Sequence, residues 1–423
     1  MKACWFLICC AAISLAQSRE LLTLEEAERI ALKNHPAIEA SRYESEAAGE
    51  RVKQFRSAYY PQATASLTAV GADDATRVAA GSLNNPVVYS RLGTGVTVSQ
   101  TLLDFGRTSH LVESSRAAAD AVTERIRATA ADVVLNVRRA YFGALRADTV
   151  LTVAKATLEA RQVVVDQTSE LVKADLKSSL DLSFAQTNLA EAKLLIASAE
   201  NERRAARASL AQALGRQDFN NTDITDVASA PLDPLALTEF QRSATLKRPE
   251  LLALRSELRS ARQFSDAERA LKYPTFALTG TMGYVPTGVS AIPSTFGAAG
   301  LNIGLPFFNG GLYKARQAEA GLRARALDRR IADAENRVAR DVSVAWLDVN
   351  TASERIPLTR QYVDQATQAV ELAQARYELG LGTMVELSQA QLVQTNAQIQ
   401  FTTATYDYQI RRALLDYAAG LLQ

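Results

Sequence analysis

Few residues of this 423-residue chain are of the types that carry out acid–base or nucleophilic chemistry. The two histidines are His35, directly before Pro36, and His110. Neither has an acidic or hydroxyl residue at the spacing of a metal site or a catalytic triad. The sequence also contains no glycine-rich phosphate loop, nucleophile elbow or zinc motif. We therefore expect no enzyme activity, no cofactor and no metal site, and we interpret both histidines as surface or packing residues.

The charged residues are nearly balanced, with 47 Lys and Arg against 46 Asp and Glu. Acids and bases alternate along the chain, which is typical of solvated helix faces. A net charge of +1 gives no electrostatic reason to expect nucleic-acid binding.

The first sixteen residues predict an export signal. Lys2 precedes an apolar run that ends in the small-residue pattern Ser14-Leu15-Ala16, so we expect residues 1–16 to be a signal peptide. All three cysteines lie within this segment. Acylation at Cys9 or Cys10 is the alternative, and the very short apolar run before them disfavours it. The mature chain then contains no cysteine, so packing or assembly must stabilise it.

An internal repeat organises the rest of the chain. Asn34-His35-Pro36 is matched by Lys247-Arg248-Pro249 at an offset of 213 residues, and Gly106 and Gly215 are matched by Gly311 and Gly420 at an offset of 205. The sequence therefore predicts two copies of one unit, residues 17–215 and 237–423, joined by a linker or small side element at 216–236. Each copy is expected to open with a capping box, formed by Thr23 with Glu26 and by Thr238 with Gln241.

Each copy then changes its apolar period from about 3.6 to 2. Apolar residues alternate with Thr and Ser in four stretches, which predict strands near 61–71, 93–104, 274–284 and 298–308. Ten tilted residues are about enough to cross the core of a bilayer. A pair of soluble hairpins packed on helices remains the alternative interpretation.

Long helices follow the strands. Only one glycine and no proline occur between Gly106 and Ala174, and apolar residues recur every seven positions from Ala144 to Val172. This spacing is typical of long helices packed side by side. Pro357 occurs in the second copy only, so we expect a kink there.

Taken in order, the Asn34-His35-Pro36 and Tyr60-Pro61 motifs, the Leu102–Gly106 segment and the turn from Arg376 to Gln391 resemble the TolC-like outer-membrane efflux protein family over essentially the whole mature chain. The resemblance implies a mainly α protein with a membrane β-barrel portion. Three subunits would share one twelve-strand barrel, continued by a tunnel of antiparallel, coiled-coil-like helices in the periplasm.

The resemblance also implies partners and sites. The subunit would contact a periplasmic adaptor through its helical tips at Ser178, Ser179, Gly382 and Thr383, and would work with an inner-membrane pump of the RND or ABC type. An acidic gate is implied near the tip, with Glu371 as first candidate and Asp364, seven residues earlier, as second. That both are ordinary solvated acids stays open, and Gln368 and Gln374 make a second acidic ring beside Glu371 doubtful.

One rival function also fits export and long helices. A periplasmic adaptor would normally carry one helical hairpin between compact β modules, whereas this chain carries two repeats with proline-led amphipathic strands. The function we predict is therefore the exit duct of an efflux or type I secretion system, in the outer membrane and extending into the periplasm, with no energy source or nucleic-acid partner of its own.

Overall fold

The computed structural model describes residues 20–73, 90–217, 222–226, 236–286 and 293–422. The predicted signal peptide, with Cys9 and Cys10, lies outside these ranges, as does most of the 216–236 segment. The first repeat contains the following helices and strands: α1 Leu24–Asn34, α2 Pro36–Arg56, a 3-10 turn at Ser57–Tyr59, β2 Gln62–Val70, β3 Arg91–Leu103, α3 Arg107–Lys173 and α4 Ser179–Ala213. The second contains α5 Leu237–Lys247, α6 Pro249–Ala270, β5 Thr275–Tyr284, β6 Thr295–Gly304, α7 Leu312–Glu378 and α8 Met384–Ala418.

The predicted repeat is confirmed by the matching lengths of these helices. α3 and α7 have 67 residues each, and α4 and α8 have 35 each. α1 begins at Leu24 and α5 at Leu237, which reproduces the offset of 213, while Arg107 and Leu312 begin α3 and α7 at the offset of 205. At 1.5 Å per residue, a 67-residue helix is about 100 Å long.

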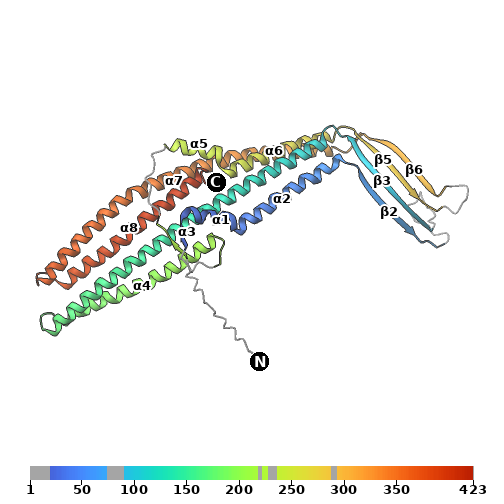
Figure 1. The fold of residues 1–423 in the computed structure, drawn as a ribbon. Helices are drawn as coiled ribbons and strands as arrows, with labels where there is room; N and C mark the ends of the chain where they lie inside the picture. Colours follow the sequence, from blue (N-terminus) through green and yellow to red (C-terminus); the bar gives the residue numbers. More distant parts are fainter. Residues whose placement is uncertain (1–19, 74–89, 218–221, 227–235, 287–292, 423) are drawn as a thin grey trace, which may run out of the picture.

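The molecule is elongated, with the helices at one end and the strands at the other (Figure 1). α3 and α4 form one antiparallel hairpin, and α7 and α8 form a second beside it. α3 and α8 pack against each other and join the two hairpins. The closed ends of both hairpins lie far from the sheet, which is connected to the opposite ends of α2, α3 and α6 (Figure 1).

The cores lie where the short helices cover the long ones. In the first repeat, Tyr141 of α3 is fully buried beside Leu210 of α4, with Ala27 and Ala31 of α1 in the same cluster. The second repeat has an equivalent cluster that includes Phe240 of α5, Val342 and Val349 of α7, and Leu415 of α8. The Tyr141 hydroxyl lies 2.9 Å from the carbonyl oxygen of Leu22 and 2.6 Å from that of Thr225.

These contacts fix a small side sheet against the core. Its two strands, β1 Glu20–Leu22 and β4 Thr222–Ile224, pair in parallel. β4 comes from the predicted linker region, so part of that segment forms a small side element.

Two predictions about element ends were wrong. Thr238 does not cap α5, because the N-cap residue is Ala236 and Thr238 lies inside the first turn; Gln241 instead donates a hydrogen bond to Ser343 of α7. Thr23 does cap α1, and its hydroxyl accepts from the Glu26 N–H at 3.3 Å. The fourth strand ends at Gly304, so Leu305 and Phe307 follow the strand and do not belong to it.

α7 continues through Pro357 as one unbroken helix. Proline removes one backbone donor, and the nearby hydroxyls of Ser353 and Thr359 donate to carbonyl groups of the same stretch. The expected kink at Pro357 stays a prediction.

The four long strands form one antiparallel sheet in the order β2-β3-β5-β6. Side chains of directly paired residues project from the same face. One row therefore joins Thr64, Thr97 and Thr281, and the next row, on the other face, joins Ala65, Val96 and Met282. The period-2 pattern thus gives a hydroxyl face and an apolar face, as predicted.

Candidate functional site

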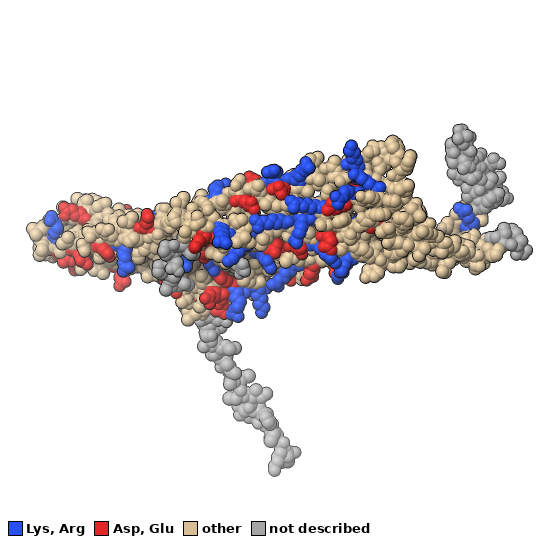
Figure 2. All heavy atoms as spheres, turned by 90° about the horizontal axis from the view of Figure 1, so that it is seen from above, with Lys and Arg blue, Asp and Glu red and all other residues tan. Residues whose placement is uncertain are grey.

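The apolar face of the sheet is exposed to the surroundings of the protomer. Leu67 is 74% exposed and Met282 67%, with Val96, Leu278 and Leu301 also exposed on this face. Arg91, at one end of β3, is the single charged residue in the four long strands. The end of the molecule that carries the sheet is accordingly almost free of charged side chains, whereas the helices are covered with them (Figure 2). An uncharged apolar surface of this kind marks contact with lipid or with another protein.

The opposite face carries hydroxyl and small side chains. The hydroxyls of Thr97 and Thr281 lie 3.3 Å apart across β3 and β5. The ring of Phe296 on β6 closes the space above Gly283, where an added Cβ atom would lie 2.6 Å from the ring. This face can contact water through its hydroxyls, while the first face is mainly apolar.

Aromatic side chains gather where the strands meet the helices. Tyr60, Phe105, Tyr273 and Phe308 are all exposed, and Phe307 is 95% exposed. The rings of Phe105 and Tyr273 are in contact, with centroids 5.3 Å apart. Amphipathic and aromatic rings at the edge of an apolar band are typical of a membrane–water interface. We call these five aromatic residues the aromatic collar. The sequence pattern assigned Phe307 to a strand and did not predict the collar.

No described helix combines the length and the apolar character needed to cross a membrane.

The predicted tip residues lie together at the closed ends of the two hairpins. Ser178 caps α4 in a full capping box with Asp181, and Thr383 caps α8 by accepting from the Glu386 N–H at 3.2 Å. Ser179 is the first residue of α4, and Gly382 directly precedes the Thr383 cap. The turns are short because Asp175 and Gly380, equivalent positions of the two repeats, both take positive φ.

The tip also exposes apolar side chains that sequence reasoning missed. They are Leu176 and Leu180 on the first hairpin and Leu379, Leu381 and Val385 on the second. Their signal in the sequence is a leucine on either side of each turn, where solvated turns normally carry polar residues.

Two contacts join the hairpins near this tip. The Lys177 ammonium donates to the Tyr377 carbonyl at 3.2 Å and lies 4.0 Å from the centre of the Tyr377 ring. The side-chain amide of Asn188 on α4 donates to Ser388 on α8 at 2.6 Å. Burial raises the pKa of the Tyr377 phenol, which therefore stays neutral at physiological pH.

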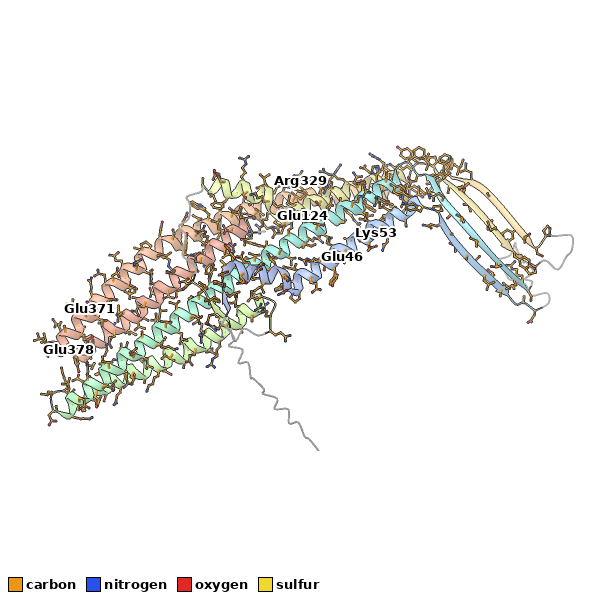
Figure 3. The ribbon with its side chains drawn as sticks, viewed as in Figure 1. Glu46, Lys53, Glu124, Arg329, Glu371 and Glu378 are labelled. Carbon is orange, nitrogen blue, oxygen red and sulfur yellow. The ribbon has the colours of Figure 1, made fainter. Side chains whose placement is uncertain are left out.

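The two predicted gate acids lie on one face of α7, two helical turns apart. Glu371 and Asp364 are both exposed, and neither forms a hydrogen bond or ion pair within the described part of the chain. Figure 3 places Glu371 on the stretch of α7 close to the tip. Both carboxylates are therefore free to face a pore or a neighbouring subunit.

The histidines occupy structural positions. His35 links α1 to α2, and its Nδ1 atom accepts from the Ala37 N–H at 3.2 Å. His110 lies 2.8 Å from the amide oxygen of Gln263. Among the described residues, no group of three or more potential metal ligands occurs.

Comparisons with known proteins agree with this architecture. A family model described as "Outer membrane efflux protein" matches residues 29–216 and 241–421. Protein CyaE of Bordetella pertussis is 27% identical over 410 residues, which cover 95% of this chain and 84% of that protein. Outer membrane protein TolC of Escherichia coli K12 is 24% identical over 430 residues, with 97% and 84% covered.

A crystal structure of CusC shares the fold, with a TM-score of 0.81, 20% identity, and 96% of this chain and 95% of that chain covered. The matched family is one of channel proteins, and nothing in these matches supports the adaptor alternative. The chain therefore belongs to the outer membrane efflux protein family, and it is a channel subunit of the outer membrane.

Proposed function

We propose that three copies of this chain form one passive exit duct, with a twelve-strand barrel in the outer membrane and a helical tunnel in the periplasm. The observation that carries the proposal is the four-stranded sheet, whose edge strands β2 and β6 have no partner within the described protomer. Backbone groups on such edges cannot be left unpaired in lipid, and membrane barrels need at least about eight strands. Three sheets joined edge to edge supply twelve strands and leave no free edge.

The two faces of the sheet then have separate roles. Exposed Leu67, Met282 and Leu301 contact the lipid chains, and the row of Thr64, Thr97 and Thr281 lines the water-filled interior. The aromatic collar around Tyr273 and Phe307 lies at the periplasmic boundary of the bilayer, because it joins the strands to the helices.

The chain is divided accordingly into a signal peptide at residues 1–16, a first repeat at 17–215, a linker at 216–236 and a second repeat at 237–423. The equal lengths of the paired helices support this division. None of these parts is assigned a catalytic role.

The tip is the contact site for a periplasmic adaptor, which in turn connects the duct to an inner-membrane pump of the RND or ABC type. Ser178, Ser179, Gly382 and Thr383 form the ends of the hairpins, and the exposed Leu176 and Leu381 beside them supply apolar area for a partner. Single exposed leucines are common, but five apolar side chains on two short turns favour a docking surface.

A narrow point of the duct lies near Glu371, with Asp364 one heptad further from the tip. Threefold repetition places three copies of each carboxylate around the axis, and concentrated negative charge attracts cations. Bending of α7 at Pro357 moves these carboxylates away from the axis when partners bind, so opening is a shift between two populated states.

The experiment that tests the duct combines outer-membrane fractionation, gels run with and without heating, and planar-bilayer conductance. A trimer-sized band that disappears on heating, together with discrete conductance steps, is expected. A soluble monomer without conductance overturns the proposal.

The same bilayers test the gate. Glu371→Gln should weaken block by divalent cations by several-fold, because it removes three negative charges from the constriction. Asp166→Asn is the matched control, since Asp166 is the repeat counterpart of Glu371 on α3, is exposed and, among the residues that the structure describes, bonds only to Gln162. Equal block in both variants and in the wild type would remove Glu371 from the gate.

A further inference from the structure

One arginine occupies a buried helix position at which the other repeat carries a small apolar residue. Arg161 on α3 is 5% exposed, and its counterpart 205 residues later is Ala366 on α7, which is 3% exposed. In the second repeat a methyl group fills this position, whereas the first repeat places a guanidinium group there. Charged side chains are seldom buried to this extent unless an acceptor or an anion accompanies them.

Arg161 has no such companion among the described residues. Its Nη1 atom is buried without a hydrogen-bond partner. Glu191 on the neighbouring α4 is the one acid that acts on it, and this exposed carboxylate forms no ion pair with it. Burial lowers the pKa of the guanidinium and Glu191 partly offsets the effect, but arginine keeps its proton in proteins. A positive charge is therefore buried with only partial compensation from a carboxylate that does not contact it.

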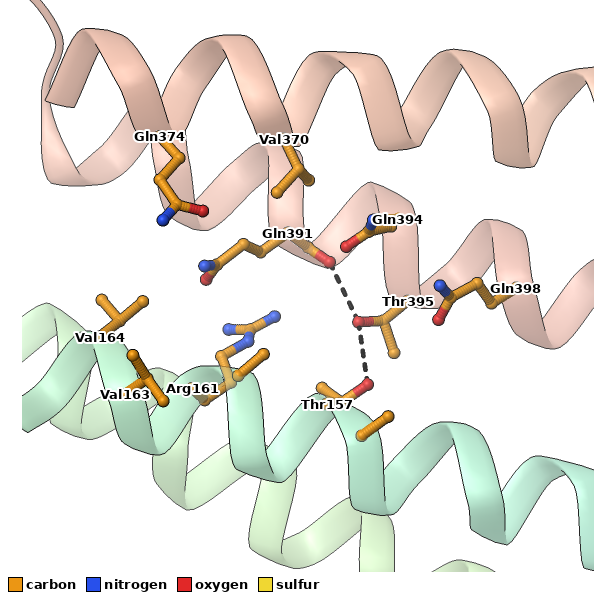
Figure 4. A pocket seen from close by; sticks show the side chains of 12 residues that line it. Thr157, Arg161, Val163, Val164, Val370, Gln374, Gln391, Gln394, Thr395 and Gln398 are labelled. Carbon is orange, nitrogen blue, oxygen red and sulfur yellow. Dashed lines mark hydrogen bonds between the residues drawn. The ribbon is translucent and has the colours of Figure 1, made fainter. Parts of the chain in front are cut away.

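The guanidinium points into a cavity between the hairpins (Figure 4). The cavity has a volume of about 360 Å³ and is lined by residues of α3, α7 and α8. Four glutamines line it, and two of their amides already donate elsewhere, Gln394 to Thr367 at 3.3 Å and Gln374 to Glu378 at 3.0 Å. The amides of Gln391 and Gln398 form no such bond within the described residues, so their N–H groups are available.

The remaining wall is apolar. Val163 and Val164 line the cavity from α3, and Val370 lines it from α7. The site thus offers one buried cation, uncommitted amide donors and a small apolar surface. A dianion such as sulfate would leave excess negative charge beside the valines, while an ammonium ion would meet a like charge.

We propose that this cavity binds a small monocarboxylate anion, held by the Arg161 guanidinium and by the amide of Gln391. A carboxylate matches the two parallel N–H groups of a guanidinium and neutralises its charge. A short alkyl chain fits against the valines. Because α3 forms one side of the cavity and α7 with α8 the other, the bound anion bridges the two hairpins. Binding of the anion does not depend on the duct proposed above.

The test is calorimetric titration of the full chain in detergent with sodium butyrate at constant chloride. Saturable binding of about one butyrate per chain is expected, with n-butanol and sulfate giving none. Arg161→Gln should weaken binding by at least about tenfold, since it removes the charge-assisted bonds. Arg204→Gln is the control, because Arg204 is an exposed arginine on α4 that lies 3.7 Å from Glu200, and it should bind butyrate as the wild type does.

Absence of butyrate binding to the wild type, or equal binding to Arg161→Gln, overturns the proposal. Sulfate or butanol that competes equally with butyrate overturns the choice of ligand. If Arg161→Gln does not assemble, Val370→Phe decides, since it fills the cavity and keeps the charge, and undiminished binding there excludes this cavity. A chain that conducts but does not bind butyrate refutes this site alone, whereas one that binds butyrate without conducting refutes the duct alone.

Discussion

The contact between Lys177 and Tyr377 gives the most direct test of how the hairpins are held together. Lys177 lies in the turn between α3 and α4, and Tyr377 lies in the last turn of α7. The ammonium bonds to the Tyr377 carbonyl at 3.2 Å and stacks 4.0 Å above its ring. Lys177→Met removes both interactions while keeping a side chain of similar length.

The size of the effect follows from these two interactions. A hydrogen bond to a charged group contributes about 1.5–3 kcal/mol and an exposed cation–π contact about 0.5–1 kcal/mol. Lys177 is only partly buried, so a total of about 1–2 kcal/mol per subunit is reasonable. At 1.4 kcal/mol per factor of ten, this shifts the local equilibrium about five- to thirtyfold. If three subunits open together, the shift multiplies to about 10²- to 10⁴-fold.

Planar-bilayer recording measures this shift as a higher open probability or a larger mean conductance. Lys173→Met is the matched control, because Lys173 is the last residue of α3, four positions before Lys177, and within the described chain it pairs only with Glu170, at 2.7 Å. The control should conduct as the wild type does. Equal conductance of Lys177→Met, Lys173→Met and the wild type would refute the view that this contact restrains the tip.

Three further predictions concern the sheet, the core and pH. Leu278→Arg should reduce recovery in the outer-membrane fraction, because Leu278 lies near the middle of β5 and an arginine facing mid-bilayer costs about 2–4 kcal/mol, while Thr279→Arg on the hydroxyl face should still insert. Tyr141→Phe should lower the free energy of unfolding by about 1 kcal/mol, because it removes the hydroxyl that bonds to the side sheet. An unfolding free energy equal to that of the wild type in calorimetry would contradict this. Burial raises the pKa of the Asp416 carboxyl in the folded chain, despite the opposing charge of Arg138. The folded chain therefore binds this proton more tightly than the unfolded chain does, and the resulting stabilisation is lost as the pH rises through the raised pKa. Asp416→Asn should therefore raise Tm at pH 7 but not at a pH below the ordinary carboxyl pKa. If the variant and the wild type differ in Tm by the same amount at both pH values, the prediction is refuted.

Much of the fold could be predicted because its periods are strong. The seven-residue spacing from Ala144 to Val172 and the absence of proline fix α3 within a few residues, and the alternation around Thr97 and Thr281 assigns both faces of the sheet. Duplication added information, since each weak motif occurs twice at a constant offset. These are local properties, which do not depend on knowing the neighbours.

The end of β6 depends on tertiary pairing and could not be predicted in the same way. Leu305 and Phe307 continue the alternating pattern, but no partner strand extends far enough to pair with them. The pattern therefore overestimated the strand by four residues at this end. Thr238 was misassigned for a related reason: a threonine followed three residues later by glutamine also fits the first turn of a helix that begins earlier.

The site could be predicted only in outline. Glu371 and Asp364 lie near the tip as the resemblance implied, but their role depends on neighbouring subunits, and it stays a prediction. Arg161 was not identified from the sequence, because an arginine next to Glu159 and Gln162 is normally solvated. Its burial becomes evident only when α8 is packed against α3.

The unpaired edges of β2 and β6 have a consequence for biogenesis. The helical hairpins are built from contacts within one chain, so each protomer can complete them alone, whereas its sheet reaches a stable environment only beside two others. Assembly must therefore precede or accompany insertion, and the yield of ducts depends steeply on subunit concentration. It follows that a chain with intact hairpins and a damaged edge strand lowers the number of working ducts more than the absence of that chain does. Such a subunit would join healthy partners and prevent their barrels from closing, so its allele would be dominant negative.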